Sequence, residues 1–426
     1  MQGLSAVRLP QEVLDTVLEN LQPGEDVQSL RQCALAARCL RPIAQRILFS
    51  AIFLSGRGRA SDNTDQDKFL KLLRQSPHLA GYIVKITLFL QPSQWDEDLA
   101  QRPLPHIIPQ LHALKRLVLY SNFDFGETDI PITSHQLYTL LGGGGIPRIR
   151  SMELVILHMA GIDDIVRVCE WLAEGGLQEL QFEGLSISDT TSPASFLDTP
   201  RPEPATFIKL KNLTVTHQSQ VLDLFLSWAV SPKSCLRFDE LRELSVGNLT
   251  ERSSKDLLRV LDIAKGSIRH IDFGGDVPSL SSIPFNSFRA LRTIACSLDI
   301  HEPSPLGEWC TALTQNKELQ LDSFIVYVTT FRRSTDEPWK GFVDHPWKDL
   351  EDVIINGTWC KQLKLSVSMS RARLNVDTLR ECFPLSHTPG HVAGSKLVVQ
   401  QSVVAGKNLQ DWEYKPIYGE WKKIDR

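Results

Sequence analysis

A short pattern of apolar residues recurs along most of the chain. It has an apolar residue, two variable positions, a second apolar residue, one variable position and a third apolar residue. The last two apolar positions are two residues apart, so they point to the same face of an extended strand. Nine copies start about 30 residues apart on average: Ile83/Ile86/Leu88, Leu114/Leu117/Leu119, Ile149/Met152/Leu154, Leu177/Leu180/Phe182, Leu210/Leu213/Val215, Leu241/Leu244/Val246, Ile268/Ile271/Phe273, Leu291/Ile294/Cys296 and Leu321/Phe324/Val326. A further copy is predicted at Cys360/Leu363/Leu365, and a last strand near 397–399.

Helical patterns separate these predicted strands. Asp163–Leu172, Val221–Trp228 and Ser254–Leu261 each place apolar residues along one helical face. Strand and helix in alternation, with this period, are typical of a leucine-rich-repeat solenoid, whose stacked units share one continuous core. A doubly wound α/β domain alternates strands and helices in the same way. The consistent internal spacing of nine copies favours the solenoid, with parallel strands and outer helices.

One copy also carries the asparagine that leucine-rich repeats place after the strand to bond the turn. Asn122 follows Leu114–Leu119 at this position. The other copies have different residues there: Leu157, Leu185, Gln218, Leu249 and Asp276. The sequence therefore predicts an irregular member of the solenoid class.

The first fifty residues carry a helical pattern instead. Five apolar residues form a stripe at helical spacing: Val13, Leu14, Val17, Leu18 and Leu21. Pro10 suits the first turn of a helix, Glu12 lies where the helix dipole favours a carboxylate, and Pro23-Gly24 ends the segment. Two shorter apolar sets follow: Val27/Leu30/Ala34/Ala37 and Leu40/Ile43/Ile47. Three helices of this size are near the lower limit for burying a core, so a partner or the rest of the chain must cover part of the apolar surface.

This N-terminal pattern resembles the F-box, through which substrate receptors dock on the Skp-type adaptor of cullin-based ubiquitin ligases. The resemblance rests on the opening Leu9-Pro10-Gln11-Glu12-Val13-Leu14 and on the stretch from Cys33 to Arg38. It implies that Leu9 and Pro10 form a docking loop. The full set of adaptor-binding residues that it implies is Leu9, Pro10, Glu12, Val13, Leu14, Val17, Leu18, Leu30, Leu35, Arg38 and Leu40.

The sequence departs from the F-box pattern at two places. Leu40 stands where family members usually have a Trp, and Ala36-Ala37 stands where a Val-Cys pair is common. An ordinary helical cap on the downstream domain is the alternative interpretation. An F-box followed by irregular leucine-rich-like repeats also resembles the expanded F-box families of mushroom-forming fungi, with the likeness carried by Ser29–Phe49 and Leu379–Leu385.

Composition restricts the function classes. The 426 residues include 42% hydrophobic residues, enough for one to three domains. A net charge of -4 argues against bulk attraction to nucleic acid or to an anionic membrane. Eight cysteines lack C-x-x-C pairs, so buried reduced thiols are expected. No basic segment followed by an apolar run opens the chain, and the prediction is a soluble protein of the cytoplasm or nucleus.

Motifs for catalysis, cofactors or metals are not found in the sequence. Gly142–Gly145 continues as Ile146-Pro147-Arg148 and lacks the Lys-Ser/Thr of a P-loop, so a turn closing a helix is expected. His301-Glu302 is followed by two prolines within three residues, which prevents a helix presenting both groups to a metal. We expect no enzymatic activity, no cofactor and no metal site.

These features predict a three-part organisation: an F-box-like helical domain at 8–50, a linker or exposed loop at 51–67 and a repeat domain at 68–426. The expected function is that of a substrate-recognition subunit of a cullin-type ubiquitin ligase, with the Skp-type adaptor and cullin as partners of the F-box. The repeats would bind an unidentified target protein. A non-catalytic leucine-rich-repeat scaffold without a ligase role is the alternative.

The sequence also indicates where a target would bind. Residues that flank the middle apolar position of each repeat point to the concave sheet face. The charged ones among them are Arg116, Glu153, Glu179, Glu183, Glu243 and Asp272. A mostly acidic face would attract a target segment that carries Lys or Arg. The alternative is that these are solvated strand positions, with binding done elsewhere.

Overall fold

The chain divides into two compact units, Met1–Ile208 and Lys209–Arg426, in the computed structural model. The structure describes residues 10–423 apart from 22–25, 56–64, 91–102, 122–130, 144–147, 189–203, 217–218, 276, 278–279, 300–304, 317, 330–339, 357–359, 370–375, 388–396, 406–407 and 416–419. Asn122 of the predicted asparagine turn and the predicted contact Leu9 lie outside the described residues.

The first unit combines short N-terminal helices with a parallel sheet. Its helices are α1 (Gln11–Glu19), α2 (Val27–Ala36), α3 (Arg41–Leu48), α4 (Asp65–Gln75), α5 (Leu104–Ile107), α6 (Ser134–Leu140) and α7 (Ile162–Ala173). Its sheet strands are β1 (Ala51–Ser55), β2 (Lys85–Leu90), β3 (Arg116–Ser121), β4 (Ser151–Val155) and β6 (Glu179–Glu183), paired in parallel in this order. A small parallel pair joins β5 (His158–Met159) to β7 (Ser186–Ile187).

The second unit has a longer sheet. Its parallel strands are β9 (Asn212–Thr216), β11 (Glu243–Gly247), β12 (His270–Gly274), β13 (Thr293–Asp299), β14 (Ser323–Thr329), β15 (Leu363–Met369) and β16 (Leu397–Ala405). The antiparallel strands β17 (Asn408–Lys415) and β18 (Glu420–Lys423) continue the sheet from β16. Its helices are α9 (Ser219–Ala229), α10 (Glu251–Ala264), α11 (Leu306–Gln315), α12 (Lys340–Val343), α13 (Trp347–Asn356) and α14 (Val376–Cys382). Two further short strands are β8 (Ile208–Lys209) and β10 (Leu236–Arg237).

The strands confirm the repeated apolar pattern. Each of the nine predicted copies coincides with a strand, as do the copy at 360–365 and the strand near 397–399. The apolar residues of neighbouring strands are in register: Leu244 of β11 pairs with Ile271 of β12, Ile271 pairs with Ile294 of β13, and all three are fully buried. Stacking identical positions in this way builds one core along each sheet. Within each unit the parallel strands follow chain order, without the reversal of a doubly wound sheet.

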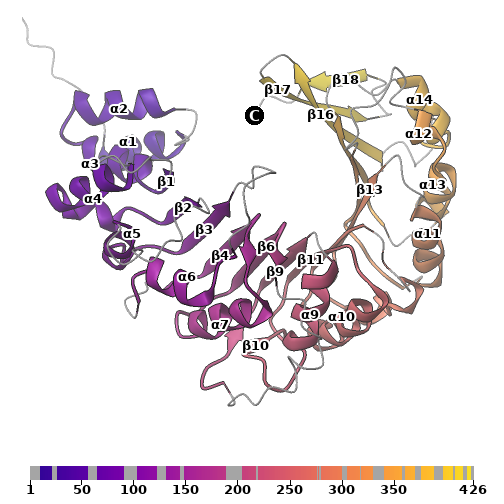
Figure 1. The fold of residues 1–426 in the computed structure, drawn as a ribbon. Helices are drawn as coiled ribbons and strands as arrows, with labels where there is room; N and C mark the ends of the chain where they lie inside the picture. Colours follow the sequence, from indigo (N-terminus) through magenta and orange to yellow (C-terminus); the bar gives the residue numbers. More distant parts are fainter. Residues whose placement is uncertain are drawn as a thin grey trace, which may run out of the picture. The chain divides into compact units, whose positions relative to one another are not determined.

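The helices that follow β1 in the first unit, and those of the second unit, cover one face of their sheet (Figure 1). Polar side chains fix neighbouring helices to one another: Thr250 Oγ1 donates to Asp223 Oδ1 at 2.7 Å, and Ser227 Oγ donates to Asp256 Oδ2 at 2.7 Å, so α9 and α10 are joined twice. Thr250 also caps α10 through a capping box with Ser253. We call the opposite face of each sheet, which carries the residues that alternate with the buried apolar positions, the open face.

The predicted linker at 51–67 is wrong in part. Residues 51–55 form β1, which pairs with β2 and buries Leu54, and α4 begins at Asp65. Phe49, Ile52 and Leu54 match the apolar spacing of the other repeats, so β1 is a strand for the same reason as its neighbours. The structure therefore has a parallel strand immediately after α3.

Three turns that follow strands contain a residue with a left-handed backbone conformation, and they lack the predicted asparagine at the next position. Ile156 and Asn248 directly follow β4 and β11 with φ of 51° and 50°, and Gly184 follows β6 with φ of 61°. The next residues, Leu157, Leu185 and Leu249, are buried. The turn position that holds asparagine in regular repeats is thus apolar and packed in the core here.

Candidate functional site

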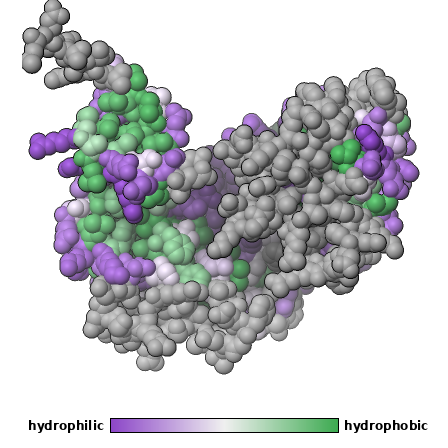
Figure 2. All heavy atoms as spheres, turned by 90° about the horizontal axis from the view of Figure 1, so that it is seen from above, coloured by the Kyte–Doolittle hydropathy of each residue, from purple (hydrophilic) through white to green (hydrophobic). Residues whose placement is uncertain are grey.

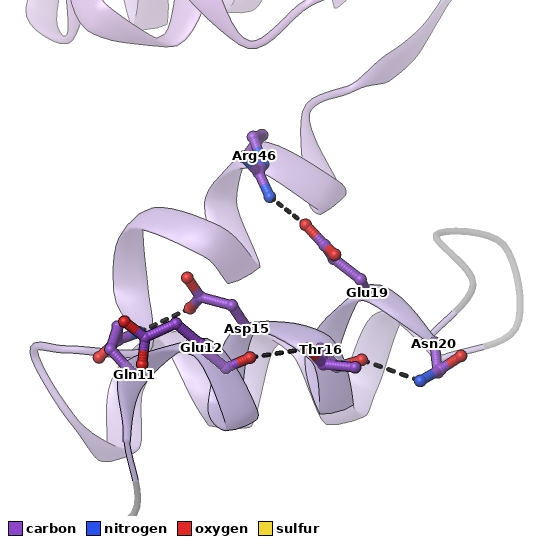
Figure 3. A network of polar contacts seen from close by, with 7 residues as sticks. All are labelled: Gln11, Glu12, Asp15, Thr16, Glu19, Asn20 and Arg46. Atoms are coloured by element: carbon purple, nitrogen blue, oxygen red, sulfur yellow. Dashed lines mark hydrogen bonds and ion pairs between the residues drawn. The ribbon is translucent and has the colours of Figure 1, made fainter.

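The first candidate site is the set of N-terminal helices. Pro10 precedes α1, and Glu12 lies in its first turn, where a carboxylate interacts favourably with the helix dipole. Figure 3 shows the polar side of α1, where Gln11 Nε2 donates to Asp15 Oδ1 at 2.6 Å, Thr16 Oγ1 to the Glu12 carbonyl at 2.7 Å and Asn20 Nδ2 to the Thr16 carbonyl at 2.8 Å. Polar groups are thereby grouped along one side of the helix, and the apolar stripe occupies the other.

Two long-range contacts set the packing of α1. Gln11 Nε2 donates to the Cys39 carbonyl at 3.3 Å, which brings the start of α1 to the turn between α2 and α3. Arg46 and Glu19 form an ion pair at 2.6 Å, which joins the ends of α1 and α3. Because both ion-pair side chains are about half exposed, solvent screens the pair and its contribution to stability is small. The core of the three helices is apolar: Leu18, Leu30, Ile43 and Ala44 are buried.

The apolar stripe of α1 is wider than the core it covers. Val13 is 43% exposed and Val17, one turn later, is 59% exposed, although Leu18 beside them is only 4% exposed. Leu35 near the end of α2 is 81% exposed. Figure 2 shows apolar side chains gathered over the N-terminal helices, at the left of the view.

The structure divides the predicted adaptor-binding residues into two groups. Pro10, Glu12, Val13, Val17, Leu35 and Arg38 are exposed, and Leu14 and Leu40 are partly exposed. Leu18 and Leu30 lie in the core of the helices and cannot meet a partner directly. The helical periodicity identified the apolar members of both groups, but it could not distinguish the residues buried in the core of the helices from those left open.

The open face of the first unit carries both signs of charge. Arg116 of β3 pairs with Glu153 of β4, and the Glu153 side chain is only 12% exposed. Gln181 Nε2 donates to Glu183 Oε2 at 3.4 Å on β6, where Glu179 is also partly exposed. Since Arg116 compensates Glu153, the acidic character predicted for this face is concentrated at Glu179 and Glu183.

The open face of the second unit carries Glu243 and Asp272. Glu243 is exposed at the start of β11. Asp272 is partly buried on β12, where Ser245 Oγ donates to its Oδ2 at 3.3 Å. Burial raises the pKa of the Asp272 carboxyl above its ordinary value, although His270 and the Ser245 hydroxyl oppose the shift. Burial also raises the pKa of the Tyr327 phenol, and the Asp272 charge adds to that shift.

The remaining chemistry is that of a packed interior. None of the eight cysteines, all of which lie in the described part of the chain, forms a disulfide bond, and six are buried. Burial raises the pKa of the Cys310 thiol to about 11 and that of Cys382 to about 12, so both are protonated and weakly nucleophilic at neutral pH. Within the described residues, no group of three or more His, Cys, Asp or Glu side chains is placed to hold a metal ion. No described helix has the length and apolar character to cross a membrane.

Two cavities in the described part are small. One of about 240 Å³ lies at the start of α13, and one of about 210 Å³ lies between α6 and α7. Both are below the range of roughly 300–1,000 Å³ typical of small-molecule sites. No protein-family model matches the chain, and no curated protein matches it.

Proposed function

We propose that this chain is a substrate-recognition subunit of a cullin-type ubiquitin ligase, whose N-terminal helices act as an F-box and bind a Skp-type adaptor. The observation that carries the proposal is the exposure of Val13, Val17 and Leu35 on a small helical module. The motif at residues 9–14 and the stretch at 33–38 support the F-box assignment. An ordinary helical cap would use its apolar stripe against its own chain.

Exposed apolar residues on neighbouring helices favour association with a partner. Burying one fully exposed Val or Leu contributes about 1.5–3 kcal/mol, and part of this gain offsets the translational and rotational freedom that the two partners lose on docking. Glu12 and Arg38 are exposed in the same module and provide polar groups of both signs. The buried Leu18 and Leu30 would act by holding the exposed residues in place.

In this proposal the rest of the chain is an irregular leucine-rich-repeat solenoid that binds the target. The chain-ordered parallel strands, one-sided helices and repeated strand spacing support this interpretation. The two open faces present polar and charged side chains to a partner. A target held there would be close to the ubiquitin-transfer machinery, and proximity makes the transfer nearly intramolecular.

Binding of purified chain to a purified Skp-type adaptor tests the proposal. Val17→Glu should weaken binding by at least about tenfold, since it removes one buried Val and places a charge in an apolar contact. Ile263→Glu is the matched control, because Ile263 is 51% exposed on α10 of the second unit and has no part in the proposed contact. The Ile263→Glu protein should bind like the unmodified chain.

Two results would count against the proposal. One is an unmodified chain that does not bind the adaptor, which would leave the scaffold interpretation in its place. The other is equal binding by the Val17→Glu and Ile263→Glu proteins, which would show that adaptor binding does not use α1. Circular dichroism of both variants should match the unmodified chain, since each replaces an exposed side chain.

A further inference from the structure

A row of arginines runs along the edge of the second unit where its parallel strands begin. Arg242, Arg269 and Arg292 directly precede β11, β12 and β13, and all three are exposed. The Arg269 N–H donates to the Arg242 carbonyl at 2.7 Å, and the Arg292 N–H donates to the Arg269 carbonyl at 2.9 Å, so the three residues lie side by side. Lys211 holds the same position before β9 and is partly exposed. We call the three arginines the arginine row, which is about 10 Å long at the usual strand spacing.

Several carboxylates in the segments that lead into these strands are paired with lysines. The ion pairs are Glu240–Lys209 at 2.8 Å, Asp262–Lys265 at 3.0 Å and Asp322–Lys361 at 2.6 Å. The hydrogen bond from Lys209 lowers the pKa of the Glu240 carboxyl, and the charge of Arg242 adds to that shift. These three carboxylates therefore have cationic partners outside the arginine row.

The centre of the row lacks such a partner. Within the described residues, none of the three arginines forms an ion pair. Arg292 Nη1 donates to the Leu291 carbonyl at 3.1 Å, which uses one of the five N–H groups of the guanidinium. Residues 266–269 and 280–292, which lead into β12 and β13, include the further exposed cation Arg289 and contain no Asp or Glu.

The remaining carboxylates lie toward the ends of the row. Asp239 and Glu243 are close to Arg242 in the sequence, and Glu318 is in the segment that leads into β14. The positive charge is therefore concentrated at Arg269 and Arg292. Like charges on neighbouring strands repel one another, so the row carries a cost in stability that a bound anion would offset. Guanidinium groups suit carboxylates in particular, because the two can form a pair of parallel hydrogen bonds.

We propose that the arginine row binds a short segment of a partner protein that is rich in Asp and Glu. An extended peptide advances about 3.3 Å per residue, so the row matches about three residues of such a segment. A nucleic acid fits less well, because its charged backbone would continue past the row toward Glu243 and Asp322, whose carboxylates repel it. The inference rests on the proposed function only where it identifies this partner with the target of the ligase.

Selection of peptides on the immobilised full-length chain tests this inference, with a phage-displayed random linear library as the probe. Selected peptides should share neighbouring Asp or Glu residues. A synthetic peptide of a selected sequence should bind the protein with Arg269→Gln and Arg292→Gln at least about tenfold more weakly than the unmodified chain, because charge-assisted hydrogen bonds are lost.

The matched control combines Arg252→Gln with Lys255→Gln. It removes the same charge from two exposed positions of α10, and these lie near the start of the helix, after the opposite end of β11. Its affinity for the peptide should equal that of the unmodified chain at physiological ionic strength, where distant exposed charges are screened. Urea unfolding of the Arg269→Gln, Arg292→Gln protein should show no loss of stability, since both side chains are exposed and carry like charge.

Changes in the peptide keep the test independent of folding. Replacing its Asp and Glu residues by Asn and Gln should weaken binding to the unmodified chain and cause little further loss on the Arg269→Gln, Arg292→Gln protein. The inference is overturned by failure to select any peptide, by selected peptides without acidic residues, or by equal binding to the unmodified and doubly substituted proteins. Tighter binding of a single-stranded oligonucleotide, lost in the doubly substituted protein, would also overturn it. Adaptor binding by α1 is measured separately, so the loss of one property leaves the other standing.

Discussion

At the residue scale, the turns after the strands show where local strain is held. Ile156 has φ of 51°, a left-handed conformation that a β-branched residue rarely adopts. Its backbone N–H donates to the Glu183 carbonyl at 2.7 Å, which fixes the turn between adjacent repeats. Asn248 adopts the same conformation after β11, and asparagine tolerates it well. The same turn is therefore made by a suitable residue in one repeat and an unsuitable one in another.

Ile156→Asn should stabilise the protein by about 1 kcal/mol, because it relieves the left-handed strain at the loss of a partly exposed side chain. The reciprocal change Asn248→Ile should destabilise it by a similar amount. Urea unfolding of both variants measures the two effects. Changes of the same sign in the two variants would show that side-chain packing, not backbone conformation, determines stability at this turn.

Asp272 should make stability depend on pH. Burial raises its pKa in the folded chain above the ordinary 3.8, so the folded protein retains the proton to higher pH than the unfolded chain. The stability from this proton is fully present below the ordinary pKa and is lost as the pH rises through the raised value. Asp272→Asn cannot ionise and should gain stability relative to the unmodified chain between about pH 4 and pH 7.

Urea unfolding midpoints of the unmodified, Asp272→Asn and Glu243→Gln proteins, measured at about pH 4 and about pH 7, test this dependence. Glu243 is exposed on the adjacent strand, so its variant serves as the control for loss of one surface charge. A relative loss of stability for Asp272→Asn on going to pH 7 would mean that the ionised carboxylate is well satisfied in the fold. A relative gain of stability for Asp272→Asn at pH 7 would show that the ionised Asp272 carboxylate destabilises the folded chain, as is common for residues at binding sites.

At the element scale, sequence periodicity predicted most strands because each needs three inward apolar positions. It missed β1, since Phe49 was assigned to the third helix and Ile52 and Leu54 were assigned to a linker. Beyond the predicted strand near 397–399 it gave no strands, whereas β17 and β18 form an antiparallel extension of the sheet. The repeat alignment places Ser245 and Ala295 beside Asp272, but it does not show how far the carboxylate is covered, so its partial burial was not predictable.

The two adjacent residues Val17 and Leu18 should separate docking from folding within α1. Leu18 is 4% exposed, and Leu18→Ala should destabilise the N-terminal helices by about 2–5 kcal/mol through lost burial and a cavity. Val17 is 59% exposed, and Val17→Ala should change stability by less than about 0.5 kcal/mol. Limited proteolysis across residues 10–48 measures both; equal protease sensitivity of the two variants would place Val17 in the core.

At the scale of the whole molecule, each unit is a parallel sheet with helices on one face, and the open faces leave polar residues available for a partner (Figure 1). Composition and strand spacing were sufficient to predict this mixed α/β class. They did not predict the division at Ile208 and Lys209, because the apolar pattern continues through both units. Docking through the N-terminal helices remains the central claim, and it concerns a surface of the first unit alone.

Hydrogen exchange of the full chain with and without a purified Skp-type adaptor tests that claim most directly. We expect slower exchange of backbone amides in α1, in α2 and in the turn that contains Arg38 and Leu40, with exchange in the strands of both sheets unchanged. Val17 and Leu35 would be covered by the adaptor, and their helices would open less often. Unchanged exchange throughout residues 10–48 at saturating adaptor, or protection confined to the repeats, would contradict it.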